Sequence, residues 1–220
     1  VAWLKKNKNL RGIVVTGCLV QRYGDEILKE LPEVDAICGV GNLDDIVAAV
    51  TYAYENGNKN VGENKKFRAI SEPEAQLLGG DRAVSDPSYS VYLKISEGCD
   101  NRCTYCVIPS IRGKFRSRPM EDILAEAKEL AELGAKEIVL ISQDTTRYGI
   151  DLYGEFRLAA LLRELCKIDG IHWIRILYCY PDEITDELIE TIATEEKVVH
   201  YIDMPIQHIS DSVLKAMNRR

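Results

Sequence analysis

Three cysteines, Cys99, Cys103 and Cys106, follow one another at the spacing CxxxCxxC. Thiolates this close in sequence are typical ligands of zinc or of an iron–sulfur cluster. A structural zinc site needs four ligands, and this segment offers no fourth cysteine or histidine nearby. Three thiolates on an iron–sulfur cluster would leave one iron with an open, reactive coordination position. The spacing therefore favours iron–sulfur chemistry, with zinc as the alternative.

The elements around these cysteines predict where the thiols lie. Residues 91–96 form a predicted strand, so the cysteines fall on the loop at its carboxyl end. Helices and strands then alternate: 118–133, 136–142, 156–168, 173–178, 184–193, 198–203 and 210–218. Four strands, each followed by a helix, predict a partial βα barrel. Active sites of βα barrels lie at the carboxyl ends of the strands, where the cysteines stand.

The helix over residues 118–133 has the clearest end signals. Pro119 is expected in its first turn, and Gly134 follows as the stop. Its predicted buried stripe consists of Ile123, Leu124, Ala127, Leu130 and Ala131.

A second α/β pattern precedes the cysteines. Strands are predicted over residues 11–16 and 34–40, and helices over 25–31 and 43–54, the latter burying Ile46, Val47 and Val50. This βαβα order predicts a parallel-sheet domain over residues 1–54. Residues 55–90 lack a period and predict a connection, with a hairpin around residues 67–70. Residues 91–220 form the second domain, so the fold class is α/β.

Composition argues against a protein devoted to nucleic-acid binding and against a membrane-spanning protein. The net charge of −7 argues against a surface devoted to nucleic acid, and no apolar run reaches the roughly 18 residues of a membrane span. No signal peptide is evident, so we expect a cytoplasmic protein. Seven cysteines without such a signal argue against disulfides, and Cys38, Cys166 and Cys179 are expected in the core. Because the chain starts at Val1 and ends within a predicted helix, we expect it to be truncated at both ends.

The cysteine segment resembles the radical S-adenosylmethionine (SAM) enzymes, in which an aromatic residue, here Tyr105, precedes the third cysteine. The segments 96–99, 108–113, 116–119 and 205–208 resemble the methylthiotransferase branch of that family. Residues 141–149 and 177–181 resemble the members that modify a ribosomal protein, whereas the transfer-RNA-modifying members usually have Gly-Gln-Asn-Val in place of residues 142–145.

This resemblance implies a 4Fe–4S cluster on Cys99, Cys103 and Cys106 that binds SAM and generates a 5′-deoxyadenosyl radical. The implied reaction inserts a methylthio group at the β-carbon of an aspartate in the twelfth small-subunit ribosomal protein. The alternatives are a transfer-RNA adenosine methylthiotransferase and an iron–sulfur electron-transfer module. An external electron donor is implied, together with RNA contacts through a C-terminal domain that this chain lacks.

A second 4Fe–4S cluster is also implied by the resemblance. Residues 16–21 are similar to the segment that carries its third cysteine, which here is Cys18. The other two ligands would precede Val1, so this chain alone is not expected to hold that cluster or to complete the reaction.

Further site residues follow from the same resemblance and from charge. Tyr105, together with Ser142, Gln143 and Asp144 after the second barrel strand, is expected to contact the cofactor. Arg175 is expected either to do the same or to pair with a carboxylate such as Asp203. Four cations alternate along one side of an extended loop, and a histidine, His208, ends the fourth predicted strand. These residues are candidates for substrate binding or for a solvated surface. The four cations are Arg112, Lys114, Arg116 and Arg118.

Overall fold

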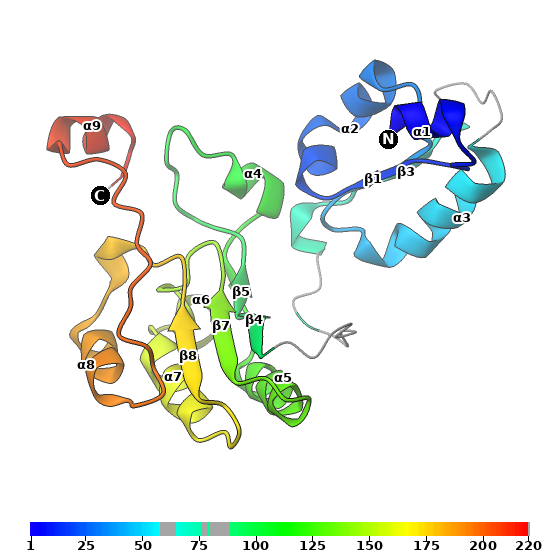
Figure 1. Ribbon diagram of the computed structural model, residues 1–220. Coiled ribbons are helices and arrows are strands. Elements are labelled where there is room, and N and C mark those ends of the chain that lie inside the picture. Colours follow the sequence, from blue (N-terminus) through cyan, green and yellow to red (C-terminus); the bar gives the residue numbers. More distant parts are fainter. Residues whose placement is uncertain (58–64, 76–78, 80–88, 220) are drawn as a thin grey trace. The chain divides into compact units, whose positions relative to one another are not determined.

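The computed structural model describes residues 1–57, 65–75, 79 and 89–219. It divides into two compact units, shown with all elements labelled in Figure 1. One comprises Val1–Leu77 with Ser110–Gly113, and the other comprises Leu78–Pro109 with Lys114–Arg220. Each unit has its own sheet and its own apolar core.

The first unit contains a parallel sheet in the order β1-β2-β3. Its strands are β1 (Val14–Thr16), β2 (Ala36–Cys38) and β3 (Phe67–Ala69), accompanied by α1 (Ala2–Asn7), α2 (Cys18–Glu30), the short 3-10 helices η1 (Leu43–Asp45) and η3 (Pro73–Ala75), and α3 (Ile46–Asn56). The predicted βαβα order is confirmed. Helix α2 buries Val20, Ile27 and Leu28 against β2.

Two predictions for this unit are wrong. Residues 67–70 form no hairpin, because β3 pairs in parallel with β2. The predicted buried face of α3 is also incorrect, since Val47 and Val50 are 71% and 51% exposed. Ala49 and Ala53 are buried instead, clustered with Ala36 and Cys38 of β2. Alanine brings the helix close to the strand, and the larger valines are left outside.

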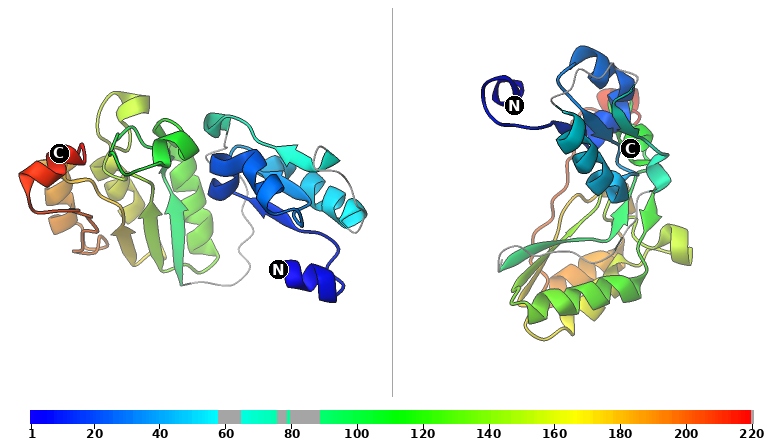
Figure 2. Two further views of the ribbon diagram at one scale, coloured as in Figure 1. Left: turned by 90° about the horizontal axis from the view of Figure 1, so that it is seen from above. Right: turned by 90° about the vertical axis from the view of Figure 1, so that its right-hand side faces the viewer.

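The second unit is built on the parallel sheet β4-β7-β8. These strands span Ser90–Lys94, Glu137–Ile141 and Trp173–Ile176, and Leu93, Leu140 and Ile176 align across them. Helices α5 (Met120–Glu132), α7 (Leu158–Cys166) and α8 (Asp186–Thr194) lie side by side against one face (Figures 1 and 2). This layer buries most of the unit's apolar side chains.

The predicted fourth strand over residues 198–203 is wrong, because the described residues there make only a single parallel bridge, Ile174 to Val198. Val198 is buried, whereas Tyr201 and Ile202 are 48% and 42% exposed, so little packing holds the segment in a strand. The remaining elements are β5 (Ser96–Glu97) and β6 (Arg116–Ser117), which pair antiparallel, with α4 (Ile108–Arg112), α6 (Ile150–Tyr153), the 3-10 helix η4 (Pro181–Glu183) and α9 (Asp211–Ala216).

The three parallel strands direct their carboxyl ends to one edge of the sheet. The chain leaves β4 through β5 and turns at Gly98, whose φ of 80° suits glycine because it has no side chain. This turn delivers the cysteine segment to that edge. Of the three cysteines expected in the core, Cys38 and Cys179 are buried and Cys166 is partly buried. Among the described residues, no helix is long and apolar enough to cross a membrane.

Candidate iron–sulfur and cofactor site

The cysteine loop, defined here as residues 98–107, carries the three thiols without regular secondary structure. Cys99 and Cys103 are 8% and 9% exposed, and Cys106 is half-buried. A turn brings the last two together, since the Cys106 amide donates to the Cys103 carbonyl at 3.0 Å. Burial raises the pKa of the Cys99 thiol to about 11, and the neighbouring Cys106 and Cys103 thiols add to this rise. Ligation of Cys99 to a metal would therefore release a proton.

The donor chemistry of this loop fits an iron–sulfur cluster, whose ligands are thiolates. Among the residues that the structure describes, no three His, Cys, Asp or Glu side chains converge as ligands of one metal ion. The thiolates of an iron–sulfur cluster bind different irons, so they need not converge on one point. Cys99, Cys103 and Cys106 therefore supply three soft ligands on one loop.

Asp144 anchors the first half of the cysteine loop. It is 1% exposed and accepts hydrogen bonds from Asn101 Nδ2 and Thr146 Oγ1, both at 2.8 Å. Burial raises its pKa, while these hydrogen bonds oppose the rise. Ser142, two residues earlier, pairs its hydroxyl with that of Ser96 at 2.6 Å. The segment after β7 is thus joined to both β5 and the cysteine loop.

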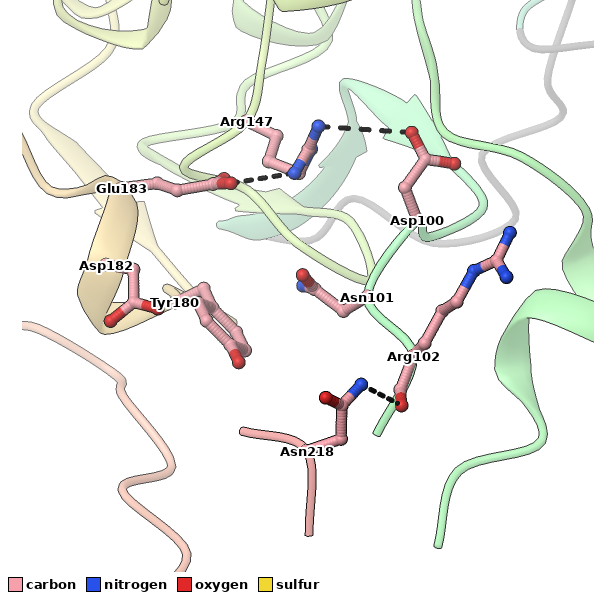
Figure 3. Close-up of a pocket in the computed structure, with 8 residues that line it drawn as sticks. All are labelled: Asp100, Asn101, Arg102, Arg147, Tyr180, Asp182, Glu183 and Asn218. Atoms are coloured by element: carbon pink, nitrogen blue, oxygen red, sulfur yellow. Dashed lines mark hydrogen bonds and ion pairs between the residues drawn. The ribbon is translucent and has the colours of Figure 1, made fainter. Parts of the chain in front are cut away.

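A polar pocket of about 450 Å³ opens beside the cysteine loop (Figure 3). Arg147 lies between two acids, with Nη1 2.7 Å from Glu183 Oε1 and Nη2 3.9 Å from Asp100 Oδ2. Burial raises the pKa of Glu183 to about 7; nearby Asp144 adds to the rise and Arg147 opposes it. The pocket is lined by Asp100, Asn101, Arg102, Arg147, Tyr180, Asp182, Glu183 and Asn218.

The predicted cofactor residues occupy different environments. Ser142 and Asp144 are buried directly after β7, and the side-chain oxygen of Gln143 is buried without a hydrogen-bond partner among the described residues. Tyr105 is 50% exposed on the cysteine loop, where desolvation and the Cys103 thiol raise its pKa. A cofactor role for these four side chains stays a prediction.

Arg175 pairs with a different acid from the one suggested. Its Nη2 and Nε atoms each lie 2.8 Å from Glu137 Oε1, and its guanidinium lies over the Tyr201 ring. The ion pair with Asp203 is therefore not formed; Asp203 accepts instead from the backbone amide of Tyr178. Glu137 begins β7, so the pair lies toward the amino end of the sheet.

Of the four alternating cations, only Arg118 is buried, and Phe115 and Ser117, which lie between cations, are buried as the alternation predicts. Lys114 is exposed, Arg112 ends α4, and Arg116 belongs to β6. Arg118 is 4% exposed, because its guanidinium pairs with Glu126 at 2.7 Å and donates to the Lys94 carbonyl. The antiparallel β5–β6 pairing turns this side chain inward. His208 is exposed, and its Nδ1 accepts from the Ser210 amide just before α9.

Cys18 stands at the first position of α2, separated from the end of β1 by one residue, and is exposed. The other cysteine of the first unit, Cys38, is buried in β2. Asp100, Arg147, Tyr180 and Glu183 were not among the predicted site residues. Arg147 and Tyr180 fall within segments that resemble the methylthiotransferases, which was the available signal for them.

Comparison with known proteins agrees with this site. The family model described as Radical SAM superfamily matches residues 93–220. Curated relatives described as "Ribosomal protein uS12 methylthiotransferase RimO" include those of Clostridium tetani, 52% identical over 98% of this chain, and Acetivibrio thermocellus, 53% identical over 98%. These alignments cover 47% and 48% of the relatives, so the chain spans about half their length.

Solved structures support the fold. A radical S-adenosylmethionine methyltransferase, TsrM, from Kitasatospora setae, determined with tryptophan and the SAM analogue aza-SAM, aligns with a TM-score of 0.68. The alignment covers 94% of this chain and 44% of TsrM at 14% identity. A second TsrM structure, with cobalamin and a [4Fe-4S] cluster bound, gives the same TM-score. The three thiols of the cysteine loop suit a 4Fe–4S cluster, to which SAM binds. With this loop at the carboxyl edge of a parallel sheet and a family match over more than half its length, the chain belongs to the radical SAM superfamily.

Proposed function

We propose that the protein is a methylthiotransferase that inserts a methylthio group at the β-carbon of an aspartate in ribosomal protein uS12. The observation that carries the proposal is an identity of 51–53% to uS12 methylthiotransferases along essentially the whole chain. The three-thiol loop supplies the matching chemistry. Modification of a ribosomal protein also suggests a cytoplasmic location.

The chain's own residues have distinct roles in this proposal. Cys99, Cys103 and Cys106 would hold the cluster. When bound, the cluster and SAM supply radical chemistry that removes hydrogen from a carbon no side-chain base could deprotonate. Asp144 fixes Asn101 of the cysteine loop and, with Ser142, gives that loop a rigid support. Arg147 and Glu183 line the neighbouring polar pocket, where they would bind polar groups by hydrogen bonds or ion pairs.

The domain assignment belongs to the same proposal. Residues 1–54 would be part of the N-terminal methylthiotransferase domain, residues 55–90 the connection, and residues 91–220 the radical SAM core. Cys18, exposed after β1, would ligate a second cluster in a longer protein that supplies two more cysteines. An external electron donor completes the proposed reaction.

Activity assays on the longer protein test this function. The anaerobically reconstituted protein, supplied with SAM and a reductant, is offered uS12 in one arm and transfer RNA in the other, and products are read by mass spectrometry. We expect a methylthio mass increase on uS12, and none with a Cys103→Ser variant. A product on RNA alone would instead identify a transfer-RNA methylthiotransferase.

A second measurement separates an enzyme from an electron-transfer module. With dithionite and SAM, an enzyme of this class forms 5′-deoxyadenosine even without its protein substrate, whereas a relay cluster forms none. Absence of this nucleoside from an iron-loaded protein would contradict the proposed function.

A further inference from the structure

The backbone on both sides of Cys103 is held by a turn from the far end of the chain. This closing turn, residues 216–218, begins at the last residue of α9. The Thr104 amide donates to the Met217 carbonyl at 3.0 Å, and Asn218 Nδ2 donates to the Arg102 carbonyl at 2.8 Å (Figure 3). Arg102 and Thr104 are the immediate neighbours of Cys103. The turn thus fixes the two peptide groups that orient this thiol.

Asn218 is suited to this turn by its backbone conformation. Its φ is 50°, in the left-handed region that asparagine tolerates better than most residues. Its amide donates to the Lys215 carbonyl at 3.1 Å, and the Arg219 amide donates to the Leu214 carbonyl at 2.9 Å. These two bonds form a Schellman motif with asparagine at the left-handed position after the helix. One residue therefore ends α9 and donates to the cysteine loop.

The residue after Asn218 fixes the turn on its other side. The Arg219 guanidinium lies 4.3 Å from the centre of the Tyr180 ring and donates to the Pro205 carbonyl. Arg219 is 7% exposed although it is charged. The closing turn is thus anchored in the unit that contains the cysteine loop, so it can act as a support.

The cysteine loop has two supports of this kind. Asp144 holds Asn101, and the Phe115 amide donates to Asp100 Oδ1 at 3.1 Å, so the first support acts before Cys103. The closing turn acts at Arg102 and Thr104. When the ligands of a metal site are already held in place, less conformational entropy is lost as the metal binds.

We infer that Asn218 is a positioning residue for the cluster, holding the Cys103 thiol in its ligating arrangement through the Arg102 carbonyl. The inference rests on the proposed iron–sulfur function for its purpose. The hydrogen bonds themselves can be tested without any cluster.

The first test measures thiol accessibility in the metal-free chain. Asn218→Asp tolerates the left-handed backbone but cannot donate from an ionised carboxylate, and Asn218→Gly keeps the backbone without a side chain. Loss of one hydrogen bond predicts that Cys103 is alkylated about two- to tenfold faster in both variants, measured by peptide mass spectrometry against Cys99 and Cys179 in the same sample. Lys215→Ala, on the exposed side of α9, is the matched control and is expected to leave the rate unchanged.

An unchanged Cys103 rate in both Asn218 variants, or an equal rise in Lys215→Ala, would overturn the inference. A uniform rise at every cysteine would indicate general unfolding and would also count against a local support. Because no metal is present, this outcome is independent of whether the proposed function is correct.

The second test uses the anaerobically reconstituted chain. We expect Asn218→Asp to bind less iron per chain than wild type, with an altered electron paramagnetic resonance signal of the reduced cluster, whereas Lys215→Ala matches wild type in both. If wild type binds no iron, the proposed function fails while the accessibility result still stands. If wild type and Asn218→Asp give identical iron content and spectra, the positioning role is wrong.

Discussion

Two buried acids of the second unit, Asp144 and Glu183, differ in how completely their carboxylate oxygens are hydrogen-bonded. Asp144 is nearly inaccessible, and both of its carboxylate oxygens accept hydrogen bonds, from Asn101 and from Thr146. Glu183 is also largely buried, but one of its oxygens has no hydrogen-bond partner among the described residues. These two acids should therefore respond differently to substitution and to pH.

Asp144→Asn is expected to lower the free energy of unfolding by about 1–3 kcal/mol, because one buried acceptor becomes a donor that no longer matches the Asn101 amide or the Thr146 hydroxyl. Urea denaturation followed by circular dichroism measures the change. Asp169→Asn, an exposed substitution of the same chemistry, serves as the control and should change stability by less than about 0.5 kcal/mol. Equal effects of the two substitutions would show that the buried hydrogen bonds contribute little.

Glu183 predicts a pH dependence of stability. Its pKa in the folded chain is about 7, above the ordinary value of 4.5, so the folded state favours the protonated form. This contribution is fully present below pH 4.5 and is lost as the pH rises through 7. Relative to wild type, Glu183→Gln should therefore gain stability between pH 5 and pH 7.5, with a slope of at most about 1.4 kcal/mol per pH unit. Denaturation at several pH values measures the difference, and parallel curves would contradict the assigned pKa.

At the scale of elements, α5 shows how a stripe of side chains fixes a helix on a sheet. Ile123, Ala127 and Leu130 are buried beneath it, and Gly134 follows with φ 102°. Leu133, at the end of the same helix, is 61% exposed. The two leucines form a matched pair for measuring what burial contributes.

Leu130→Ala is expected to cost about 2–5 kcal/mol in the free energy of unfolding, through lost apolar burial and the cavity left behind. Leu133→Ala should cost less than about 0.5 kcal/mol. Chemical denaturation of both variants tests the pair, and a Leu133→Ala effect as large as that of Leu130→Ala would mean that the exposed leucine has a partner in solution.

The predictability of these elements follows from their length and packing. The helix over residues 118–133 and the strands over residues 136–142 and 173–178 were predicted to within two residues at each end, because a regular apolar stripe or a β-branched run fixes each one locally. Pro119, expected in the first turn of the helix, is its N-cap instead. The face of α3 was mispredicted because two alanines, which carry little hydrophobic signal, provide the close contact with β2.

The site was predictable only in part for a related reason. Spacing identifies the three cysteines, since their sequence positions place them on one loop. The supports are formed by residues far away in sequence: Asn218 lies 116 residues from Arg102, and Asp144 lies 43 residues from Asn101. Such pairings depend on tertiary structure, so no local sequence pattern predicts them. The inward position of Arg118 depends likewise on the β5–β6 pairing.

At the scale of the whole molecule, the two units differ in their capacity for clusters. The second unit has three thiols on one loop, whereas the first has Cys18 exposed and Cys38 buried in a strand. Anaerobic reconstitution of this 220-residue chain should therefore incorporate about four irons per chain, the content of one 4Fe–4S cluster. Iron and sulfide analysis measures this.

Two variants locate the iron. Cys103→Ser should lose most of it, and Cys18→Ser should retain it. Retention of iron by Cys103→Ser would place the cluster elsewhere, and roughly eight irons per wild-type chain would show that the first unit binds a cluster with fewer cysteines than expected.

The division into two units also has a spectroscopic consequence. The chain's two tryptophans are distributed one to each unit, Trp3 in α1 and Trp173 in β8. Trp3→Phe and Trp173→Phe therefore each leave one largely exposed indole, which lies in only one of the two units. Separate melting midpoints in the two single-tryptophan proteins would show that the halves unfold one after the other, whereas coincident midpoints would show a single cooperative transition.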